Sequence, residues 1–384
     1  FIIFISMAIY KIFPYKDSTL YSLYPNSNFG LDSISETNNI IGISGTPDVA
    51  RFLTQFDTSE IIDVINNTIS GSEWDVNFRT FIAEAQGIST EQVLEVYPLA
   101  QDWSNGTGEF GDSPATTNGV TWVDRTSKDV NPWDMSGNVG TELFTGSFNP
   151  TYSPQGGGSW FYSGSGVSSY KVTQSFDLRS DKDLNVGTKT IVSKWYSGSL
   201  PNYGFLAKLD SSAEFYATSS DQPILKYYSV DTNTIYPPQL EFKWRDYSTV
   251  LTGPASGSIL TDSNLKLSLA ENPGTFNVKS INRFRLNISP TYPPRTFQTS
   301  SYYVGKNYLP VASYYSLKDL DTNEIIFDFD DQYTQISSDN TGNYFDIYMD
   351  GLEPERYYKI LIKTTIDGSL KIFDDNYYFK VING

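Results

Sequence analysis

The sequence has 384 residues, which is enough for two to three domains with substantial apolar cores. It contains no cysteine and no histidine, which excludes disulfides, thiolate metal sites and catalytic systems that depend on an imidazole base. The formal net charge of −17 argues against a nucleic-acid partner, because a phosphate backbone would be repelled. Aromatic residues make up 15% of the chain, and together with abundant glycine, serine, threonine and asparagine they favour an antiparallel β-protein with many turns.

The first six residues are mostly apolar and precede Met7. The stretch is too short for a membrane span and lacks the basic region of a signal peptide. We therefore expect Met7 to be the natural start, and we expect no membrane partner.

Short runs that suit a pleated surface recur along the first 230 residues. They predict strands within residues 9–24, 51–56, 78–85, 93–99, 120–124, 170–178, 189–195, 202–208, 215–218 and 224–228. Residues 58–69 differ, because their isoleucines follow a helical spacing behind Ser59, a plausible N-cap. We predict a helix there that plugs one end of a β-sandwich.

Two long polar segments interrupt these strands. Trp103 and Trp122 bracket the first one, and we interpret them as buried anchors that pin a long loop to the sandwich. The second, residues 134–170, contains the glycine run 156–158. No lysine-bearing helix follows that run, so it is not a phosphate loop. We predict a flexible or surface-displayed loop whose aromatic residues Trp160, Phe161 and Tyr162 offer a docking point for a partner.

The clearest alternation in the sequence lies in residues 239–246. It predicts that Leu240, Phe242 and Trp244 face a core while Glu241, Lys243 and Arg245 face water. This strand closes a first domain, residues 1–248. Residues 249–262, rich in glycine, serine and proline, are the predicted linker, and residues 263–384 form a second β-rich domain.

The second domain carries one spacing that is fairly specific for a fold. Strands are predicted within residues 283–289, 325–329, 344–349 and 357–364. Leu352, Pro354 and Tyr358 have the spacing of a tyrosine corner, in which the tyrosine hydroxyl ties back to nearby backbone in Greek-key sandwiches. The predicted fold class is all-β, a jelly-roll-like β-sandwich followed by an immunoglobulin- or fibronectin III-like β-sandwich.

Several short blocks, taken in order, resemble a known family. They are KDSTLYS with NFGL (residues 16–31), RFLTQF (51–56), DWSNGTG (102–108), NGVTW (118–122) and NYGFL (202–206). Together they resemble the DNRLRE-type, disaggregatase-related sandwich domain, which is jelly-roll-like and similar to carbohydrate-binding modules. Further blocks, QLEFKW (239–244), YPPRTFQTSSYY (292–303), residues 342–364 and the final FKV, resemble virion structural proteins of T4-like tailed phages, especially marine ones.

This resemblance implies a particle component and brings no catalytic residues with it. We therefore expect a non-enzymatic structural protein, located in the virion, that docks on other virion proteins and forms homo-oligomers under the particle's symmetry. The alternative is a carbohydrate-binding or receptor-recognition protein that contacts a host-surface glycan.

Candidate site residues follow from these two hypotheses. Exposed aromatic faces stack on sugar rings, and the loops contain Trp133, Trp160, Tyr196 and Tyr203 beside Phe161 and Tyr162. Burial in a core or an interface is the ordinary alternative for such residues. Asp328, Asp330 and Asp331 are the best ligand set for a hard cation such as calcium, although EF-hand spacing is absent and solvated acidic side chains are the simpler interpretation. No other cofactor is expected.

Overall fold

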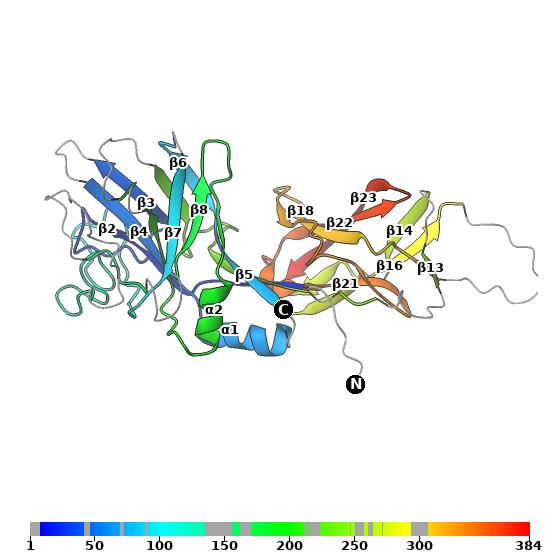
Figure 1. Ribbon diagram of the computed structural model, residues 1–384, viewed down its shortest axis with the longest axis horizontal. Helices are drawn as coiled ribbons and strands as arrows, with labels where there is room; N and C mark the ends of the chain where they lie inside the picture. The colour runs from blue at the N-terminus through cyan, green and yellow to red at the C-terminus, as the bar shows by residue number, and fades with distance from the viewer. Residues whose placement is uncertain are drawn as a thin grey trace, which may run out of the picture. The chain divides into compact units, whose positions relative to one another are not determined.

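The computed structural model describes residues 8–41, 47–69, 73–88, 91–134, 156–161, 170–210, 213–214, 223–245, 247–249, 257–259, 264–270, 272–292 and 306–384 (Figure 1). The chain divides into two compact units. The first unit contains residues 12–68 and 75–241, and the second contains residues 1–11, 69–74 and 242–384. Strands dominate both units, so the predicted all-β fold class is confirmed.

The first unit is built on one large sheet, in the strand order β6-β11-β3-β4-β10-β7-β8 with β2 also paired to β4. Its strands are β2 (Lys16–Tyr21), β3 (Ile34–Ile41), β4 (Pro47–Gln55), β6 (Ile82–Gln86), β7 (Gln92–Pro98), β8 (Val172–Phe176), β10 (Phe205–Leu209) and β11 (Ile224–Tyr228). The pairing of β10 places Leu206 between Leu53 and Tyr97, and all three are fully buried. These residues share a core cluster with Trp103 and Trp122, which confirms the two predicted tryptophan anchors.

A smaller sheet has the order β1-β12-β5-β9. Its strands are β1 (Ala8–Ile12), β12 (Gln239–Trp244), β5 (Trp74–Thr80) and β9 (Leu184–Gly187). The alternation in β12 is confirmed for its apolar residues, since Leu240, Phe242 and Trp244 are at most 1% exposed. The prediction that Glu241 faces water is wrong: this carboxylate is buried and pairs with Arg79 at 3.1 Å.

The helices correct two local predictions. Helix α1 (Thr58–Asp63) begins two positions earlier than expected, because its N-cap is Asp57, whose carboxylate accepts from the Ser59 backbone N–H at 2.7 Å. A π-helical segment, η1 (Val64–Ile69), continues it. Residues 189–196, of which 189–195 were expected to be a strand, form the second helix, α2 (Lys189–Tyr196). The buried residues Ile191, Val192 and Trp195 explain the error, since a short β-branched run suits either a strand or one helix face.

Two other expected strands have different outcomes. Residues 120–124 form no strand and contribute only an isolated bridge between Asp124 and Pro132. The expected strand at residues 215–218 lies outside the described residues.

A buried charge network crosses the core of the first unit. Arg51 and Glu214 are fully buried and joined by two hydrogen bonds of 2.7 and 3.0 Å. Lys208, also fully buried, lies 3.4 Å from Glu214 and 3.0 Å from Glu95. Buried charges are tolerated when each has such partners, because desolvation is otherwise costly.

The glycine run at 156–158 belongs to this interior. Arg51 donates to the Gly157 carbonyl at 2.6 Å, and residues 156–160 are buried. A Cβ on Gly157, which has a φ of +80°, would lie 2.5 Å from the Arg51 guanidinium. The prediction of a surface-displayed loop is therefore wrong for these residues. Trp122, Arg51 and Leu206 leave no room for a Cβ at positions 156–158, which are therefore glycine.

The second unit contains two sheets and a short parallel pair, β13-β17. One sheet has the order β14-β16-β21-β20 and the other β15-β23-β22-β18-β19. The strands are β13 (Gly257–Ile259), β14 (Leu265–Ala270), β15 (Thr275–Asn277), β16 (Ile281–Pro290), β17 (Lys306–Tyr308), β18 (Ser313–Asp319), β19 (Ile325–Phe327), β20 (Ser337–Asp339), β21 (Gly342–Tyr348), β22 (Tyr357–Ile366) and β23 (Ser369–Ile382), with a 3₁₀ turn, η3 (Met349–Gly351). Stacked rings of Tyr315 and Phe345, 4.5 Å apart, join the two sheets.

The predicted tyrosine corner is confirmed in this unit. Tyr358 is 2% exposed, and its hydroxyl donates to the Glu353 carbonyl at 3.0 Å, five residues upstream. Burial raises the pKa of Tyr358, because the charged phenolate would lose its hydration.

The unit boundaries differ from the predicted domains. The second unit begins at residue 242 and takes in residues 1–11 and 69–74, which the sequence assigned to the first domain. Ile9 lies in its core cluster, and the Tyr10 hydroxyl donates to Asp350. The predicted linker, residues 249–262, contains β13, while residues 250–256 and 260–262 lie outside the described residues.

Candidate functional site

The aromatic residues singled out in the sequence have different fates. Trp133 is 6% exposed and Trp160 is fully buried, so neither presents a face to a sugar or a partner. Phe161 and Tyr203 are half-buried, and Tyr203 packs against the tryptophan core cluster. Tyr196 is exposed at the end of α2, where its hydroxyl donates to Asn66 at 2.7 Å. Tyr162 lies outside the described residues.

The predicted cation site is not formed. Across the part of the chain that the structure describes, no three acidic side chains converge as a metal-holding group, and this includes Asp328, Asp330 and Asp331. The Asp330 carboxylate instead caps a turn by accepting from the backbone N–H groups of Gln332 and Tyr333, at 2.7 and 3.0 Å. Asp328 accepts locally from Phe329.

A different site is formed by two interlocked loops of the first unit. Loop A, residues 22–33, joins β2 to β3, and loop B is residues 104–119. Asn28 in loop A is 1% exposed, and its amide N–H donates to the carbonyls of Asn105 and Val120, both at 2.7 Å. Its side-chain oxygen accepts from the backbone N–H groups of Gly30 at 3.2 Å and Gly108 at 2.8 Å. One buried side chain therefore holds both loops.

The two backbones approach each other so closely that loop B requires glycine. A Cβ on Gly108 would lie 2.1 Å from the Asn28 carbonyl oxygen. Two further hydrogen bonds join the loops, from the Leu31 N–H to the Gly108 carbonyl at 3.0 Å and from the Phe110 N–H to Asp32 at 2.8 Å. This close packing fixes the position of Phe110.

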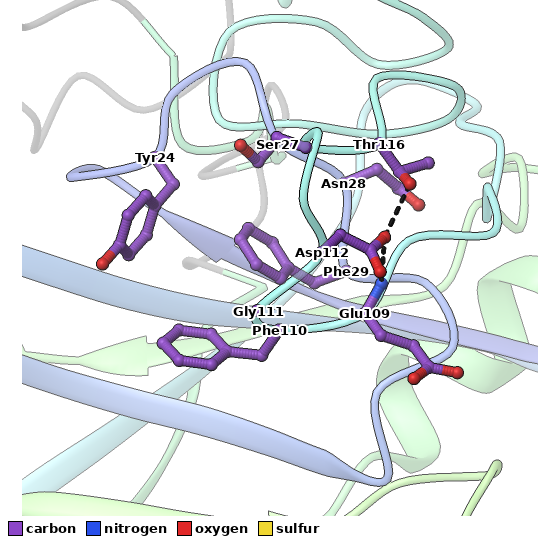
Figure 2. Close-up of a pocket in the computed structure, with 10 residues that line it drawn as sticks. Tyr24, Ser27, Asn28, Phe29, Glu109, Phe110, Gly111, Asp112 and Thr116 are labelled. Atoms are coloured by element: carbon purple, nitrogen blue, oxygen red, sulfur yellow. Dashed lines mark hydrogen bonds between the residues drawn. The ribbon is translucent and has the colours of Figure 1, made fainter.

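Four aromatic rings cluster where the loops meet. Tyr21 and Phe29 are buried at 5% and 4% exposure, whereas Tyr24 and Phe110 are 41% and 60% exposed. The rings of Tyr24 and Phe110 meet edge to face, with centroids 5.9 Å apart. Figure 2 shows Tyr24 and Phe110 beside the buried Phe29, with Glu109 and Asp112 on the same loop as Phe110. The buried pair supports the two rings that reach solvent.

Two pockets flank these exposed rings, and both are lined by Tyr24 and Phe110. The smaller one, about 210 Å³, lies between the loops and is completed by Ser27, Asn28, Phe29, Glu109, Gly111, Asp112, Ala115 and Thr116. The larger one, about 460 Å³, extends over β3 and is completed by Tyr21, Asp32, Ser33, Ile34, Glu36, Asn38, Ile40, Asp48 and Lys226. The larger volume falls in the range of small-molecule sites, and the smaller has room for a single ring.

The electrostatics of the pockets are strongly acidic. Burial, together with Glu109, Asp112 and Glu36, raises the pKa of Asp32 to about 6. Burial also raises the pKa of Asp48, and Glu36 adds to this rise. Hydrogen bonds from Thr116 and the Glu109 N–H instead lower the pKa of Asp112 (Figure 2). For Asp32 and Asp48, burial outweighs the backbone hydrogen bond that each carboxylate accepts, whereas the hydrogen bonds to the exposed Asp112 outweigh its small burial.

This arrangement suits recognition of a polar ligand with an apolar face. Exposed rings supply stacking surface, while carboxylates and amides supply hydrogen-bond acceptors and donors. Sequence reasoning missed the site because Tyr24 and Phe110 are far apart in the chain. The blocks NFGL, DWSNGTG and NGVTW contain several of the residues that interlock the loops, and they were the available signal.

Comparison with known proteins gives no family assignment: no protein-family description matches the sequence, and a search of curated proteins returns no significant match. None of the described helices has the length and apolar character needed to cross a membrane.

Proposed function

We propose that the chain is a non-enzymatic structural component of a tailed-phage virion, which docks on the particle and mediates assembly or display. The resemblance to virion proteins of T4-like phages motivates this proposal. Its partners would be other virion proteins and further copies of the same chain, arranged by the symmetry of the particle.

The observation that supports a structural role is the use of charged side chains as internal braces. Arg51 and Glu214 join distant segments inside the first unit. In the second unit, bidentate salt bridges join Arg283 to Asp346 and Arg356 to Asp319, with shortest N–O distances of 2.8 and 2.6 Å. β-Rich units that are stabilised by internal salt bridges suit a function that depends on a fixed shape.

Particles made without this protein test the proposal. Electron microscopy should show a missing appendage or failed assembly, and supplying the wild-type chain should restore the particle. Supplying Glu214→Ala, which breaks the internal brace, should restore it less well. Particles that are unchanged by loss of the protein would refute the assignment.

Carbohydrate recognition is the second candidate function, and the exposed rings of Tyr24 and Phe110 between two pockets favour it. Sugar rings bind proteins by stacking their apolar faces on aromatic side chains and by hydrogen bonding through their hydroxyls. The resemblance to carbohydrate-binding modules points to the same unit of the chain.

A glycan array with the purified full-length chain tests this second function. We expect hits that weaken at least tenfold in Tyr24→Ala and in Phe110→Ala, because stacking contributes on the order of 1–2 kcal/mol. Tyr196→Ala, which removes an exposed ring outside the two pockets, is the matched control and should bind like the wild type. No hits, or equal loss in the control, would remove carbohydrate recognition from consideration.

A further inference from the structure

The charge of the two pockets restricts the kind of sugar that fits them. Their combined lining contains five carboxylates and a single lysine, Lys226. That lysine is paired with Glu84 at 3.1 Å, which offsets its charge. A neutral sugar would leave this excess of negative charge uncompensated, whereas a cationic one would neutralise it.

Several acceptors in the larger pocket remain available. Asp32 and Asp48 each use one carboxylate oxygen, Oδ1, to accept from the Phe110 and Leu23 N–H groups, at 2.8 and 3.3 Å. Within the described residues, their second oxygens have no hydrogen-bond partner. The buried Asn38, which lines the same pocket, donates to Glu36 at 2.6 Å while its side-chain oxygen has no partner in that part of the chain. These oxygens accept hydrogen bonds and match a ligand that donates them.

We propose that the pocket pair binds an oligosaccharide of hexosamines whose amino groups are free and protonated. The inference rests on the proposed carbohydrate recognition and names its ligand class. The rings of Tyr24 and Phe110 would stack on sugar rings and attract the nearby ammonium group by cation–π interaction. Asp32, Glu36 and Asp48 would accept from the amine in the larger pocket, and Glu109 would do so in the smaller one.

Two features favour an amino sugar over a basic peptide. Both pockets share Tyr24 and Phe110 as lining, so consecutive rings of an oligosaccharide would occupy neighbouring pockets. Burial is the main reason that the pKa of Asp32 is raised, and Glu109, Asp112 and Glu36 add to the rise by repulsion, which a rigid ligand with regularly spaced cations would relieve.

Isothermal titration calorimetry of the full-length chain with two matched tetrasaccharides tests the inference. One is the β-1,4-linked tetramer of N-acetylglucosamine, and the other is its fully de-N-acetylated form. At low ionic strength we expect roughly tenfold tighter binding of the de-N-acetylated tetramer, because cation–π and ion-pair contributions sum to about 1–2 kcal/mol. Oligolysine of equal charge should bind more weakly than this tetramer.

Variants separate charge recognition from sugar recognition. Asp32→Asn combined with Asp48→Asn should abolish the preference, so that the two tetramers bind with similar affinity. Phe110→Ala, at a position that is 60% exposed, should weaken the binding of both ligands. Glu91→Gln, an exposed carboxylate outside the pockets, is the control and should change neither.

Each outcome has a distinct meaning. Equal binding of both tetramers, still dependent on Phe110, would overturn the charge inference and leave carbohydrate recognition standing. Binding of neither tetramer, in a series where the glycan array also gives no hits, would overturn both. Oligolysine that binds as tightly as the de-N-acetylated tetramer would assign the site to a basic peptide instead.

Discussion

Asn28 and Asn105 each donate a side-chain hydrogen bond to a backbone carbonyl of the opposite loop. The Asn28 amide donates to the Asn105 carbonyl, and the Asn105 amide donates to the Gly30 carbonyl, each at 2.7 Å. Asparagine suits this role because its amide presents both a donor and an acceptor in one plane. The pair holds Phe110 and Tyr24 where two pockets can form beside them.

Replacing Asn28 by alanine should therefore destabilise the first unit. It would leave the Asn105 and Val120 carbonyls and the Gly108 N–H without a buried partner, at a cost of about 1–3 kcal/mol for each unsatisfied group. We expect a total loss of roughly 3 kcal/mol in the free energy of unfolding, measured by denaturant titration. Asn67→Ala, at an exposed helical position, is the matched control and should change stability by less than about 0.5 kcal/mol. Equal effects for the two variants would contradict the role assigned to Asn28.

Breaking the buried ion pair should have a larger effect. Glu214→Ala would remove the carboxylate that pairs with the fully buried Arg51 guanidinium. Leaving that charge without its ion-pair partner should lower the free energy of unfolding by about 3–5 kcal/mol. The double variant Arg51→Met with Glu214→Met should regain most of that stability, since apolar side chains of similar volume replace both charges. Chemical denaturation of the wild type, Arg51→Met, Glu214→Met and the double variant measures the coupling in a double-mutant cycle. Additive effects would show that the pair is not coupled.

Asp17 should make the stability of the protein depend on pH. Burial raises the pKa of its carboxyl to about 8 in the folded chain, far above the value of 3.8 expected for a solvated group. At a pH between these two pKa values, the Asp17 carboxyl is protonated in the folded chain and ionised in the unfolded chain. The free energy of unfolding should therefore fall as the pH rises from about 4 to about 8 and then level off.

Asp17→Asn should flatten this profile. We expect the variant to match the wild type near pH 4 and to exceed it at pH 8 by on the order of 5 kcal/mol, as measured by denaturant titration at each pH. Asp181→Asn, at an exposed turn, serves as the control and should retain the wild-type slope. An Asp17→Asn profile with the original slope would rule out this carboxyl as the cause.

The tyrosine corner offers a matched pair of adjacent tyrosines. Tyr358→Phe deletes the hydroxyl that donates a hydrogen bond to the Glu353 carbonyl. We expect the loss of this bond to lower the free energy of unfolding by about 1–2 kcal/mol. Tyr357→Phe, where the side chain is 43% exposed, should cost much less. Thermal unfolding of the two variants compares them directly, and similar melting temperatures would contradict the structural role of the corner.

Binding of the proposed cationic sugar should also titrate. An oligosaccharide with trimethylated amines keeps its charge at every pH, so a change in affinity reports on the protein. The pKa of Asp32 is about 6, and affinity should therefore fall as pH drops through 6 and this carboxylate gains a proton. The charged and titratable groups that surround it are Asp17, Tyr21, Tyr24, Glu36, Asp48, Glu109, Asp112, Lys226 and Asp231. Asp32→Asn should remove the inflection, and an unchanged curve would show that Asp32 does not contact the charge.

Features that depend on neighbouring residues were predictable from the sequence. The alternation of Leu240, Phe242 and Trp244 identified a buried strand face, and the spacing of Leu352 and Tyr358 identified the corner. Both signals lie within a few residues of the contacts they predict, so local geometry is sufficient to interpret them.

Features that depend on long-range contacts were not predictable. Arg51 has the pattern of an ordinary strand residue, and its partner Glu214 is 163 residues away. The pocket rings, Tyr24 and Phe110, come together only after Asn28 has joined two loops, and neither loop has a periodic pattern. Trp160 was misassigned to a docking surface for the same reason, since the residues that bury it are distant in the chain.

The position of β1 has a consequence for biosynthesis. Ile9 packs in the core of the unit whose remaining strands come from residues 242 onward. The ribosome therefore synthesises Ile9 well before the strands that bury it, and this segment can pack only after residues 12–241 have been translated. Nascent chains truncated before residue 242 should hold residues 8–11 in a protease-accessible state, and a cleaved or separately expressed C-terminal half would lack part of its own interior.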